Sequence, residues 1–352
     1  MKTVGFDLWA GQVRGAGENR ATVLRPAPRV DHPSGNLIGT RDFRALFHQA
    51  YVRFASACRA VDEPGIAVIA VNELTGQPAG MCTLMARVAR YVAAMVGRHD
   101  ACDLFLQGSD DLALRHLAIV LDPVRSWSRD STQVRYRVLD LRTQNGYRDE
   151  HGKPLRGMRC EGPAMLRVGG FALFILPLGA PSDWPGSGND AWEMIPERVY
   201  FDELANVPES SIPRMPARAF QNASTHVSVI MRTAGPRDTG DSLVQPGAGV
   251  GTLELIGRHH RGTLTLGQSA LRDGVLVGRY ARCDGASLLD DPSLSRVHAL
   301  LLDVEDAFLV IDTASRNGTR LHGQTDARVI AIAGDTELGL GSRTRARWRF
   351  SA

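Results

Sequence analysis

Three short motifs near the C-terminal end of the sequence decide its fold: Val277-Gly278-Arg279, Ser295-Arg296-Val297-His298 and Ser315-Arg316-Asn317-Gly318-Thr319. Each motif lies at the end of a predicted apolar strand, where a loop is expected to begin. A single Gly-Arg or Asn-Gly pair occurs by chance in most proteins of this length. Three motifs in a fixed order, each at a strand end, are a much stronger signal than any one of them.

This set of motifs resembles the FHA (forkhead-associated) domain, a β-sandwich that binds phosphothreonine peptides. The resemblance covers about residues 252–352 closely. It implies that Arg279 and Ser295 contact the phosphate. The other residues that the resemblance assigns to phosphopeptide binding are Arg296, Arg316 and Asn317, and those that it assigns to structural support are Gly278, His298 and Gly318.

The residue types at these positions suit a doubly charged ligand. A phosphothreonine carries close to two negative charges and three acceptor oxygens, so its receptor needs a cation and several fixed donors. Arg279 can supply a forked set of charged donors, and Ser295 adds a hydroxyl. Asn317 can present both a donor and an acceptor to a peptide main chain. An isolated arginine at a strand end is usually a solvated charge, but the three ordered motifs favour binding.

A second copy of the pattern occurs earlier in the chain. Residues 96–103 align with residues 277–284, and in both copies an aspartate precedes the asparagine by the same interval. Such self-similarity indicates a duplicated fold. The sequence therefore predicts a mainly β protein with two FHA-like β-sandwich domains in tandem and one N-terminal amphipathic helix.

The two copies differ at the positions that bear on phosphate binding. Ala113 stands where the C-terminal copy has Ser295, and Leu114 stands where it has Arg296. Leucine offers a phosphate neither charge nor a side-chain donor. The residues that remain as a degenerate N-terminal site are Arg98, Arg115, His116 and Asn145, of which Arg115 would have to swing in to replace the lost cation.

Four segments follow from these patterns. They are an irregular arm plus the helix at 1–64, a divergent FHA-like domain at 65–178, a Pro/Gly-rich linker and extension at 179–251, and an FHA domain at 252–352. Within the second segment, the apolar run Thr83 to Ala94 is predicted as one strand.

The predicted helix follows Thr40-Arg41-Asp42 and ends near Pro64. Its apolar residues recur at three-and-four spacing, which is typical of one buried stripe. A helix packed on the first sandwich is favoured over a free partner-binding helix, because such stripes are usually core. The stripe consists of Phe43, Leu46, Phe47, Ala50, Tyr51, Phe54 and Cys58.

Composition and motifs argue against a nucleic-acid-binding protein, a secreted or membrane protein, and an enzyme. A net charge of +3 is too small and dispersed to indicate nucleic acid as the main partner. The five cysteines form no C-x-x-C pair, which favours a reducing cytoplasm. Met1-Lys2-Thr3 is not followed by an apolar run, so we expect no signal peptide, and no apolar run approaches the length that membrane insertion needs. Catalytic motifs and clustered metal ligands are not found, so we expect neither an enzyme nor a cofactor.

The favoured function is a phosphothreonine-binding adaptor in Ser/Thr-kinase signalling. Its partner would be a threonine-phosphorylated protein, either a kinase or a kinase substrate, and the N-terminal copy would be a degenerate interaction module. The alternative is a phosphate-independent scaffold or a homo-oligomerising structural protein. A third option joins them, with a phosphorylated Thr233 or Thr239 captured by the C-terminal site. Richness in Ala, Arg and Gly fits a bacterial gene of high GC content.

Overall fold

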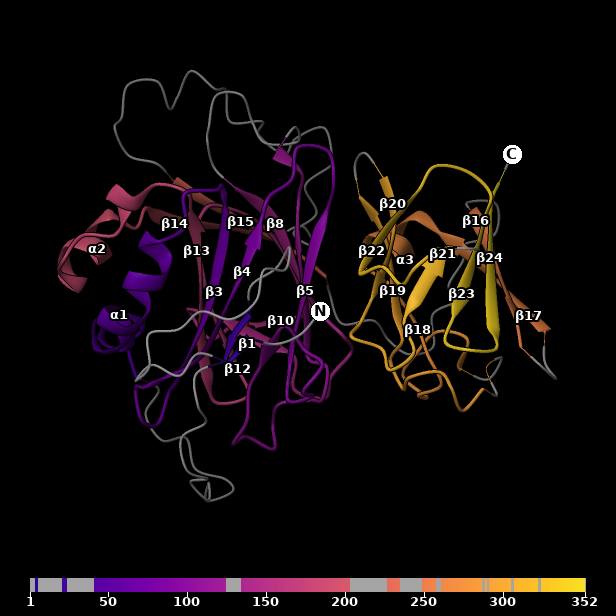
Figure 1. Cartoon of the computed structure of the whole chain (residues 1–352), viewed down its shortest axis with the longest axis horizontal. Helices are drawn as coiled ribbons and strands as arrows, with labels where there is room; N and C mark the ends of the chain where they lie inside the picture. The colour runs from indigo at the N-terminus through magenta and orange to yellow at the C-terminus, as the bar shows by residue number, and fades with distance from the viewer. Residues whose placement is uncertain are drawn as a thin grey trace. The chain divides into compact units, whose positions relative to one another are not determined.

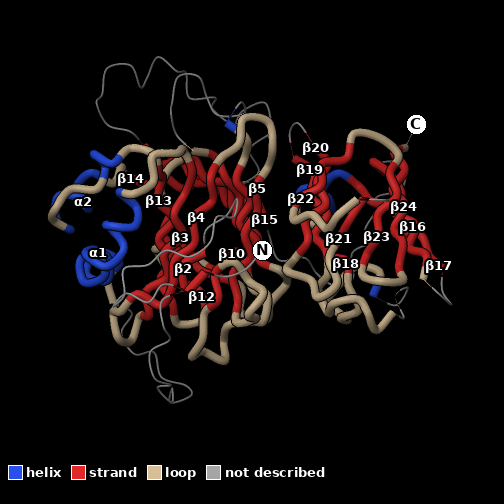
Figure 2. The backbone as a smooth tube through the Cα atoms, in the orientation of Figure 1, coloured by secondary structure: helices blue, strands red, loops and turns tan. Residues whose placement is uncertain are grey.

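The computed structural model divides the chain into two compact units, Met1–Gly235 and Pro236–Ala352, each built mainly of strands (Figures 1 and 2). The residues that the structure describes are 4–5, 21–23, 41–124, 134–202, 227–234, 249–257, 261–286, 289, 291–304, 307–321 and 324–351. Most of the predicted irregular arm, and residues 235–248 of the predicted linker, therefore lie outside the described part.

The first unit is a sandwich of an eight-stranded and a seven-stranded sheet. The eight strands are ordered β1 (Val4–Gly5), β2 (Ala21–Val23), β4 (Pro78–Met85), β3 (Gly65–Asn72), β13 (Phe171–Leu178), β12 (Ala164–Val168), β9 (Tyr147–Asp149) and β10 (Pro154–Leu155). The seven strands are ordered β14 (Glu197–Asp202), β15 (Val227–Ala234), β11 (Gly157–Glu161), β8 (Arg135–Asp140), β7 (Leu117–Leu121), β5 (Val92–Gly97) and β6 (Leu104–Phe105). The two sheets enclose a continuous apolar core.

The second unit is a smaller sandwich with α3 (Gln268–Arg272) beside it. One sheet is ordered β17 (Arg261–Gly267), β16 (Gly249–Ile256), β24 (Thr344–Phe350), β23 (Thr336–Leu340) and β21 (Thr319–Leu321). The other is ordered β18 (Val275–Val277), β19 (Ala299–Val304), β20 (Ala307–Asp312) and β22 (Val329–Ile332). Trp348 is fully buried between them and stacks on Phe308, with ring centroids 4.4 Å apart.

The two sandwiches share one topology. Among the strands common to both units, the first strand pairs with the second and with the last, and the last pairs with the strand before it; β1, β2, β14 and β15 of the first unit lie outside this common set. This gives β4-β3-β13-β12 in the first unit and β17-β16-β24-β23 in the second. The opposite sheets match in the same way, as β5-β7-β8-β11 and β18-β19-β20-β22. The predicted fold class, two β-sandwiches in tandem with an N-terminal helix, is confirmed.

Helix α1 (Phe43–Arg59) covers the outer face of the eight-stranded sheet, beside β3 and β13 (Figure 1). All seven residues of the predicted stripe are buried, so the interpretation as core is confirmed. Phe47 lies at the centre of this second core, with ring contacts to Tyr51, Phe54, Phe174 and Trp192.

Much of the segment predicted as a linker belongs to the first unit. It contains η2 (Pro181–Asp183), α2 (Gly188–Met194) and strands β14 and β15, which extend the seven-stranded sheet. Trp184 is buried under α1, and Tyr200 donates a hydrogen bond to Glu150 at 2.7 Å. The many prolines and glycines mask these anchoring aromatic residues in the sequence pattern, and the boundary between units moves to about residue 235.

The single strand predicted from Thr83 to Ala94 is wrong. Strand β4 ends at Met85 and β5 begins at Val92, and the two strands belong to different sheets. The chain crosses from one layer to the other between them, where Val88 is exposed. Apolar periodicity does not reveal such a crossing, because strands of both sheets are buried and apolar. No described helix is long and apolar enough to cross a membrane.

We predict that Phe47→Ala lowers the free energy of unfolding of the first unit by about 3–5 kcal/mol, because it removes a buried ring and leaves a cavity. Urea unfolding followed by tryptophan fluorescence measures the change. Val52→Ala on the same helix is the control, since Val52 is 76% exposed and its truncation should cost less than about 0.5 kcal/mol. Equal losses in the two variants would contradict the assignment of α1 to the core.

Candidate functional site

Two loops meet at one end of the C-terminal sandwich, one between β18 and β19 and the other between β20 and β21. The first loop doubles back on itself, because the main-chain N–H of Tyr280 donates to the carbonyl of Arg296 at 3.0 Å. A side chain at Gly278 would place its Cβ only 2.3 Å from that same carbonyl oxygen. Glycine is therefore required for this close approach of two backbone segments.

His298 joins the two loops from inside the protein. Its ring is fully buried, and Nδ1 accepts the main-chain N–H of Ser295 at 3.1 Å. The other nitrogen, Nε2, lies 2.9 Å from the carbonyl oxygen of Gly318, to which its proton donates. The ring thus satisfies one donor and one acceptor on different loops, which is the bracing role that the resemblance implies.

Asp312 shapes the second loop; the sequence analysis used this aspartate only to align the two copies and assigned it no role. Its carboxylate accepts from the N–H of Ser315 at 2.8 Å and from the hydroxyl of Thr319 at 2.9 Å. The loop then turns at Gly318, whose φ of 70° lies in the left-handed region that favours glycine. Its position just before a turn, with Ser315 three residues later, is the sequence signal that could have found it.

Ser295 is almost buried and its hydroxyl is oriented by the second loop. Its exposed fraction is 8%, and its Oγ accepts the main-chain N–H of Arg316 at 2.9 Å. A hydroxyl that accepts a hydrogen bond in this way can donate its own hydrogen to a ligand. The main chain therefore orients a side-chain donor at the junction of the two loops.

Three arginines belong to these loops. Arg279, Arg296 and Arg316 are all exposed. The Nε of Arg279 donates to the carbonyl of Leu294 at 2.8 Å, which holds the base of the guanidinium and leaves the outer nitrogens for a ligand. A hydroxyl donor on loops that also carry three exposed arginines is suited to a tetrahedral anion rather than to a metal ion. Among the described residues, no cluster of His, Cys, Asp or Glu could hold a metal.

Asn317 lies beside these groups with its amide fixed. Its Nδ2 donates to the carbonyl of Ser293 at 2.7 Å, while the side chain stays exposed. One amide hydrogen and the amide oxygen can therefore meet a peptide main chain. The five predicted binding residues are thus carried by two adjoining loops.

The loop that holds Ser293 was also missed. Asp291 accepts from the N–H of Ser293 at 2.8 Å and from the hydroxyl of Thr344 at 2.8 Å. Burial raises the pKa of Asp291, but these hydrogen bonds outweigh it and hold the pKa below its ordinary value. The Asp-Pro-Ser pattern, typical of a turn closed by an aspartate side chain, was the signal available.

The N-terminal unit repeats this framework bond for bond. The N–H of Ala113 donates to His116 Nδ1 at 3.0 Å, and His116 Nε2 lies 2.7 Å from the carbonyl oxygen of Gly146. These are the equivalents of the bonds that His298 makes. Further equivalent pairs are the Cys102 and Cys283 thiols donating to loop carbonyls, the Asp140 and Asp312 loop caps, and the left-handed residues Arg142 and Ala314.

The side chains offered to a ligand are not repeated in the first unit. Gln144 stands at the position of Arg316, whose N–H donates to the Ser295 hydroxyl. Because Ala113 replaces that serine, the N–H of Gln144 has no equivalent hydroxyl to bond. Arg115 is only 9% exposed, so its guanidinium is not presented to solvent as the swinging substitute would require. Arg98 is exposed, but Asn145 lies against the carboxylate of Asp111 at 3.4 Å. This end of the first sandwich has lost cations and gained a negative charge.

Comparison with known proteins agrees with this geometry. Residues 275–341 match the model of the FHA domain family. The chain is similar to the FHA-1 domain of Rv1747 from Mycobacterium tuberculosis, with 22% identity, coverage of 29% of this chain and 98% of that one, and a TM-score of 0.23. The FHA domain of the CT664 protein from Chlamydia trachomatis gives 22% identity, 29% and 98% coverage, and a TM-score of 0.25.

A eukaryotic structure is also similar. The yeast Dun1 FHA domain, solved in complex with a doubly phosphorylated peptide from Rad53, is 19% identical, with coverage of 34% of this chain and 87% of that one and a TM-score of 0.25. No curated protein matches the chain. The family match confirms the predicted resemblance for the C-terminal unit, and it does not extend to the first unit.

We predict that His298→Ala loosens both loops of the C-terminal unit. The substitution leaves the N–H of Ser295 without its partner, at a cost of about 1–3 kcal/mol for a buried group, and removes one of the two bonds to the carbonyl of Gly318, which keeps the N–H of Gly341. Hydrogen exchange of the full chain, followed by mass spectrometry, should show faster exchange in both loops. His116→Ala is the matched variant and should loosen only the first unit. Unchanged exchange around Ser295 in His298→Ala would contradict the bracing role.

Proposed function

We propose that the C-terminal sandwich binds a phosphothreonine peptide through Arg279, Ser295, Arg296, Arg316 and Asn317. The observation that carries the proposal is the bond from the Arg316 N–H to the Ser295 hydroxyl, which turns the hydroxyl into an oriented donor beside exposed guanidinium groups. A phosphate oxygen placed there would receive the serine hydrogen and charged hydrogen bonds from Arg279.

The peptide main chain would lie against Asn317. Because Ser293 already accepts one hydrogen of the Asn317 amide, the amide plane is held in place before a ligand arrives. Such preorganisation reduces the entropy lost on binding. The phosphate would supply affinity, and the amide would fix the direction of the peptide.

The chain would act as an adaptor in Ser/Thr-kinase signalling, with a phosphorylated kinase or kinase substrate as partner. The first unit would add a contact that does not depend on phosphate. Its support is the pairing of an intact loop framework with Ala113, Leu114 and Asp111, which offer a dianion neither a hydroxyl donor nor a cation. Capture of a phosphorylated Thr239 of the chain itself, a residue outside the described part, is a special case of the same binding; Thr233, the other candidate, lies in strand β15.

We predict micromolar affinity, about −8 kcal/mol, of the full chain for members of a phosphothreonine peptide library. Arg279→Ala and Ser295→Ala should each weaken binding on the order of tenfold to a hundredfold, since a hydrogen bond to a charged group contributes about 1.5–3 kcal/mol. Calorimetry measures both, with unphosphorylated peptides as controls. Binding that persists unchanged in Arg279→Ala would support the phosphate-independent scaffold instead.

Transferring the ligand-facing residues to the first unit, as a graft, tests why this unit is proposed not to bind phosphate. In a chain whose C-terminal site is disabled by Arg279→Ala, the substitutions Asp111→Ser, Ala113→Ser and Leu114→Arg should create phosphate-dependent binding. The hydroxyl introduced at position 113 can accept a hydrogen bond from the main-chain N–H of Gln144, as the Ser295 hydroxyl accepts one from the N–H of Arg316.

The matched control for the graft adds Arg98→Ala to the same three substitutions. This change should abolish the gained binding, because it removes the cation equivalent to Arg279. Retention of the gained affinity without Arg98 would show that the graft binds the peptide in some other way.

A further inference from the structure

Strand β17 forms one edge of the five-stranded sheet in the C-terminal unit. It pairs with β16 on one side, and among the described residues no further main-chain hydrogen bond to β17 is found. The opposite edge of the same sheet is engaged, because the N–H groups of Gln324 and Ala327 donate to carbonyls of β21 at 3.0 and 2.9 Å. The edge of β17 therefore presents N–H and C=O groups with which a further strand can pair.

The first unit shows how the equivalent edge is treated elsewhere in the same chain. Strand β4 has the position of β17 in the shared topology, and its edge is covered by β2. The two strands are antiparallel, with Thr22 opposite Met81. This edge of the fold thus accepts an added antiparallel strand. In the second unit the described part of the chain supplies no such strand, so the edge of β17 is left for a partner.

The sequence of β17 carries little protection against pairing. Soluble proteins guard a long edge strand with lysine, proline or inward-pointing charges. The seven residues from Arg261 to Gly267 include neither lysine nor proline, and their one charge is the first residue, whose side chain is 67% exposed. Strand β14, which ends the seven-stranded sheet of the first unit, instead carries Glu197, Arg198 and Asp202.

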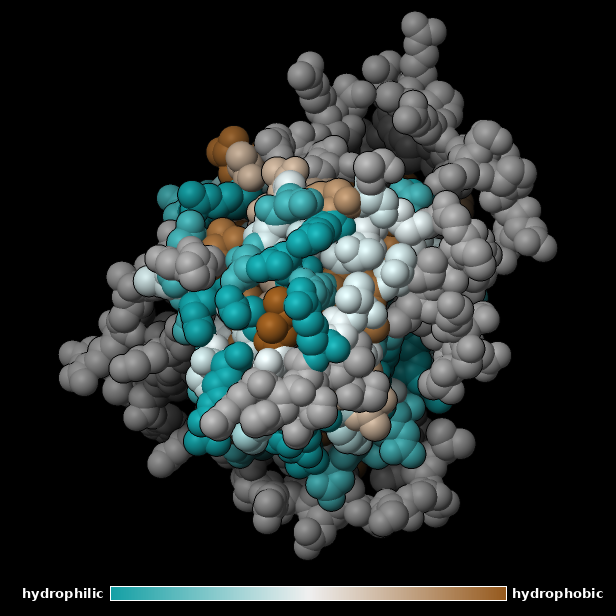
Figure 3. All heavy atoms as spheres, turned by 90° about the vertical axis from the view of Figure 1, so that its right-hand side faces the viewer, coloured by the Kyte–Doolittle hydropathy of each residue, from teal (hydrophilic) through white to brown (hydrophobic). Residues whose placement is uncertain are grey.

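The two faces of β17 differ as those of an interior strand do. Thr263 and Thr265 are exposed on the outer face, whereas Leu264 packs against the core of the unit. Strand β16 beside it has the same alternation of buried and more exposed residues. Leu264 is only partly buried, and a further strand in the same sheet would cover more of it. Figure 3 views the C-terminal unit from the side of this sheet and shows mainly hydrophilic residues around small apolar spots.

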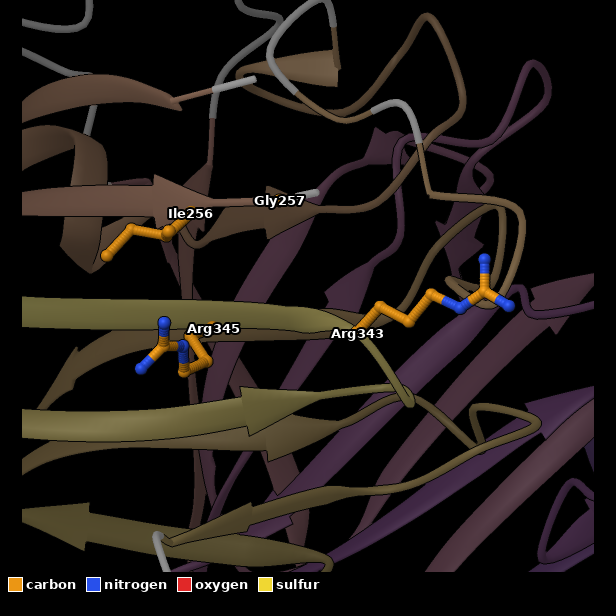
Figure 4. Close-up of a pocket in the computed structure, with 4 residues that line it drawn as sticks. All are labelled: Ile256, Gly257, Arg343 and Arg345. Atoms are coloured by element: carbon orange, nitrogen blue, oxygen red, sulfur yellow. The ribbon is translucent and has the colours of Figure 1, made fainter. Parts of the chain in front are cut away.

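Positive charge gathers at the end of the sheet where β17 begins. Arg261 is paired with Ile256, beside a hollow of about 510 Å³. The hollow is lined by Ile256, Gly257, Arg343 and Arg345 (Figure 4). Figure 4 shows Ile256 and Arg345 on neighbouring strands, with Arg343 on the turn before β24. A strand that pairs with β17 should therefore bring no positive charge of its own to this end.

We propose that the edge of β17 binds the same strand of a second copy of this chain, antiparallel and centred on Leu264. Most homo-oligomers are dimers with twofold symmetry, and a twofold axis perpendicular to a sheet makes two copies of an edge strand antiparallel. With Leu264 opposite its own copy, all seven residues of β17 overlap, whereas moving the centre by one residue leaves two residues of each copy unpaired. The proposal uses no residue of the phosphothreonine site.

This register brings compatible side chains together. On the outer face, Thr263 lies opposite Thr265 of the second copy, and threonine pairs across strands stabilise a sheet. On the inner face, the two leucines at 264 meet. Arg261 lies opposite Gly267 of the second copy, so the two arginines at 261 are separated by six residues, or about 20 Å. Each copy thus keeps its positive charge away from the cationic end of the other.

The test measures the oligomeric state of the full chain by sedimentation velocity over a series of concentrations, in about 50 mM salt so that charges are little screened. We expect a concentration-dependent dimer. The substitutions Thr263→Lys with Thr265→Lys should weaken it about tenfold or more, because two pairs of like charges then lie opposite each other. Thr263→Lys with Thr265→Glu should retain the dimer, because the same register then pairs opposite charges.

A mixing experiment separates the proposed register from loss of folding. The substitutions Thr263→Glu with Thr265→Glu should also prevent dimerisation, but a mixture of this variant with the first one should form mixed dimers. Arg279→Ala should dimerise like the unaltered chain. A monomeric unaltered chain, equal dimerisation of all the β17 variants, failure of the mixture to dimerise, or loss of the dimer in Arg279→Ala would each overturn the proposal.

Discussion

The candidate site depends on one buried imidazole. His298 accepts from the first loop through Nδ1 and donates to the second loop through Nε2, and both bonds are shielded from water. Two further bonds cross the same junction, from the N–H of Arg316 to the Ser295 hydroxyl and from the Asn317 amide to the Ser293 carbonyl, but both lie nearer the surface than the imidazole. Because an unpaired polar group in the interior is costly, the two imidazole bonds hold a single arrangement of both loops. The exposed arginines then need only surround a donor that is already in place.

The first unit separates this framework from its chemistry. His116 makes the same two bonds, and the aspartate cap, the left-handed residues and the thiol contact recur, although Ala113 and Leu114 replace the ligand-facing side chains. The bonds that shape the loops use main-chain groups and buried side chains. The side chains that would meet a ligand point to solvent and contribute little to folding. Binding chemistry can therefore change on this fold while the fold itself persists.

The sequence by itself determined the elements whose signal is local: the loop motifs of the C-terminal unit, the repeat, and α1, whose seven apolar residues are all buried. It did not determine where the run from Thr83 to Ala94 changes sheet, or that β14 and β15 join the first unit. It also assigned no role to Asp312 or Ser293. These features arise from pairing between residues far apart in the chain, and a local pattern carries no record of which strands become neighbours. Tertiary structure decided them, because strand register alone brings such side chains together.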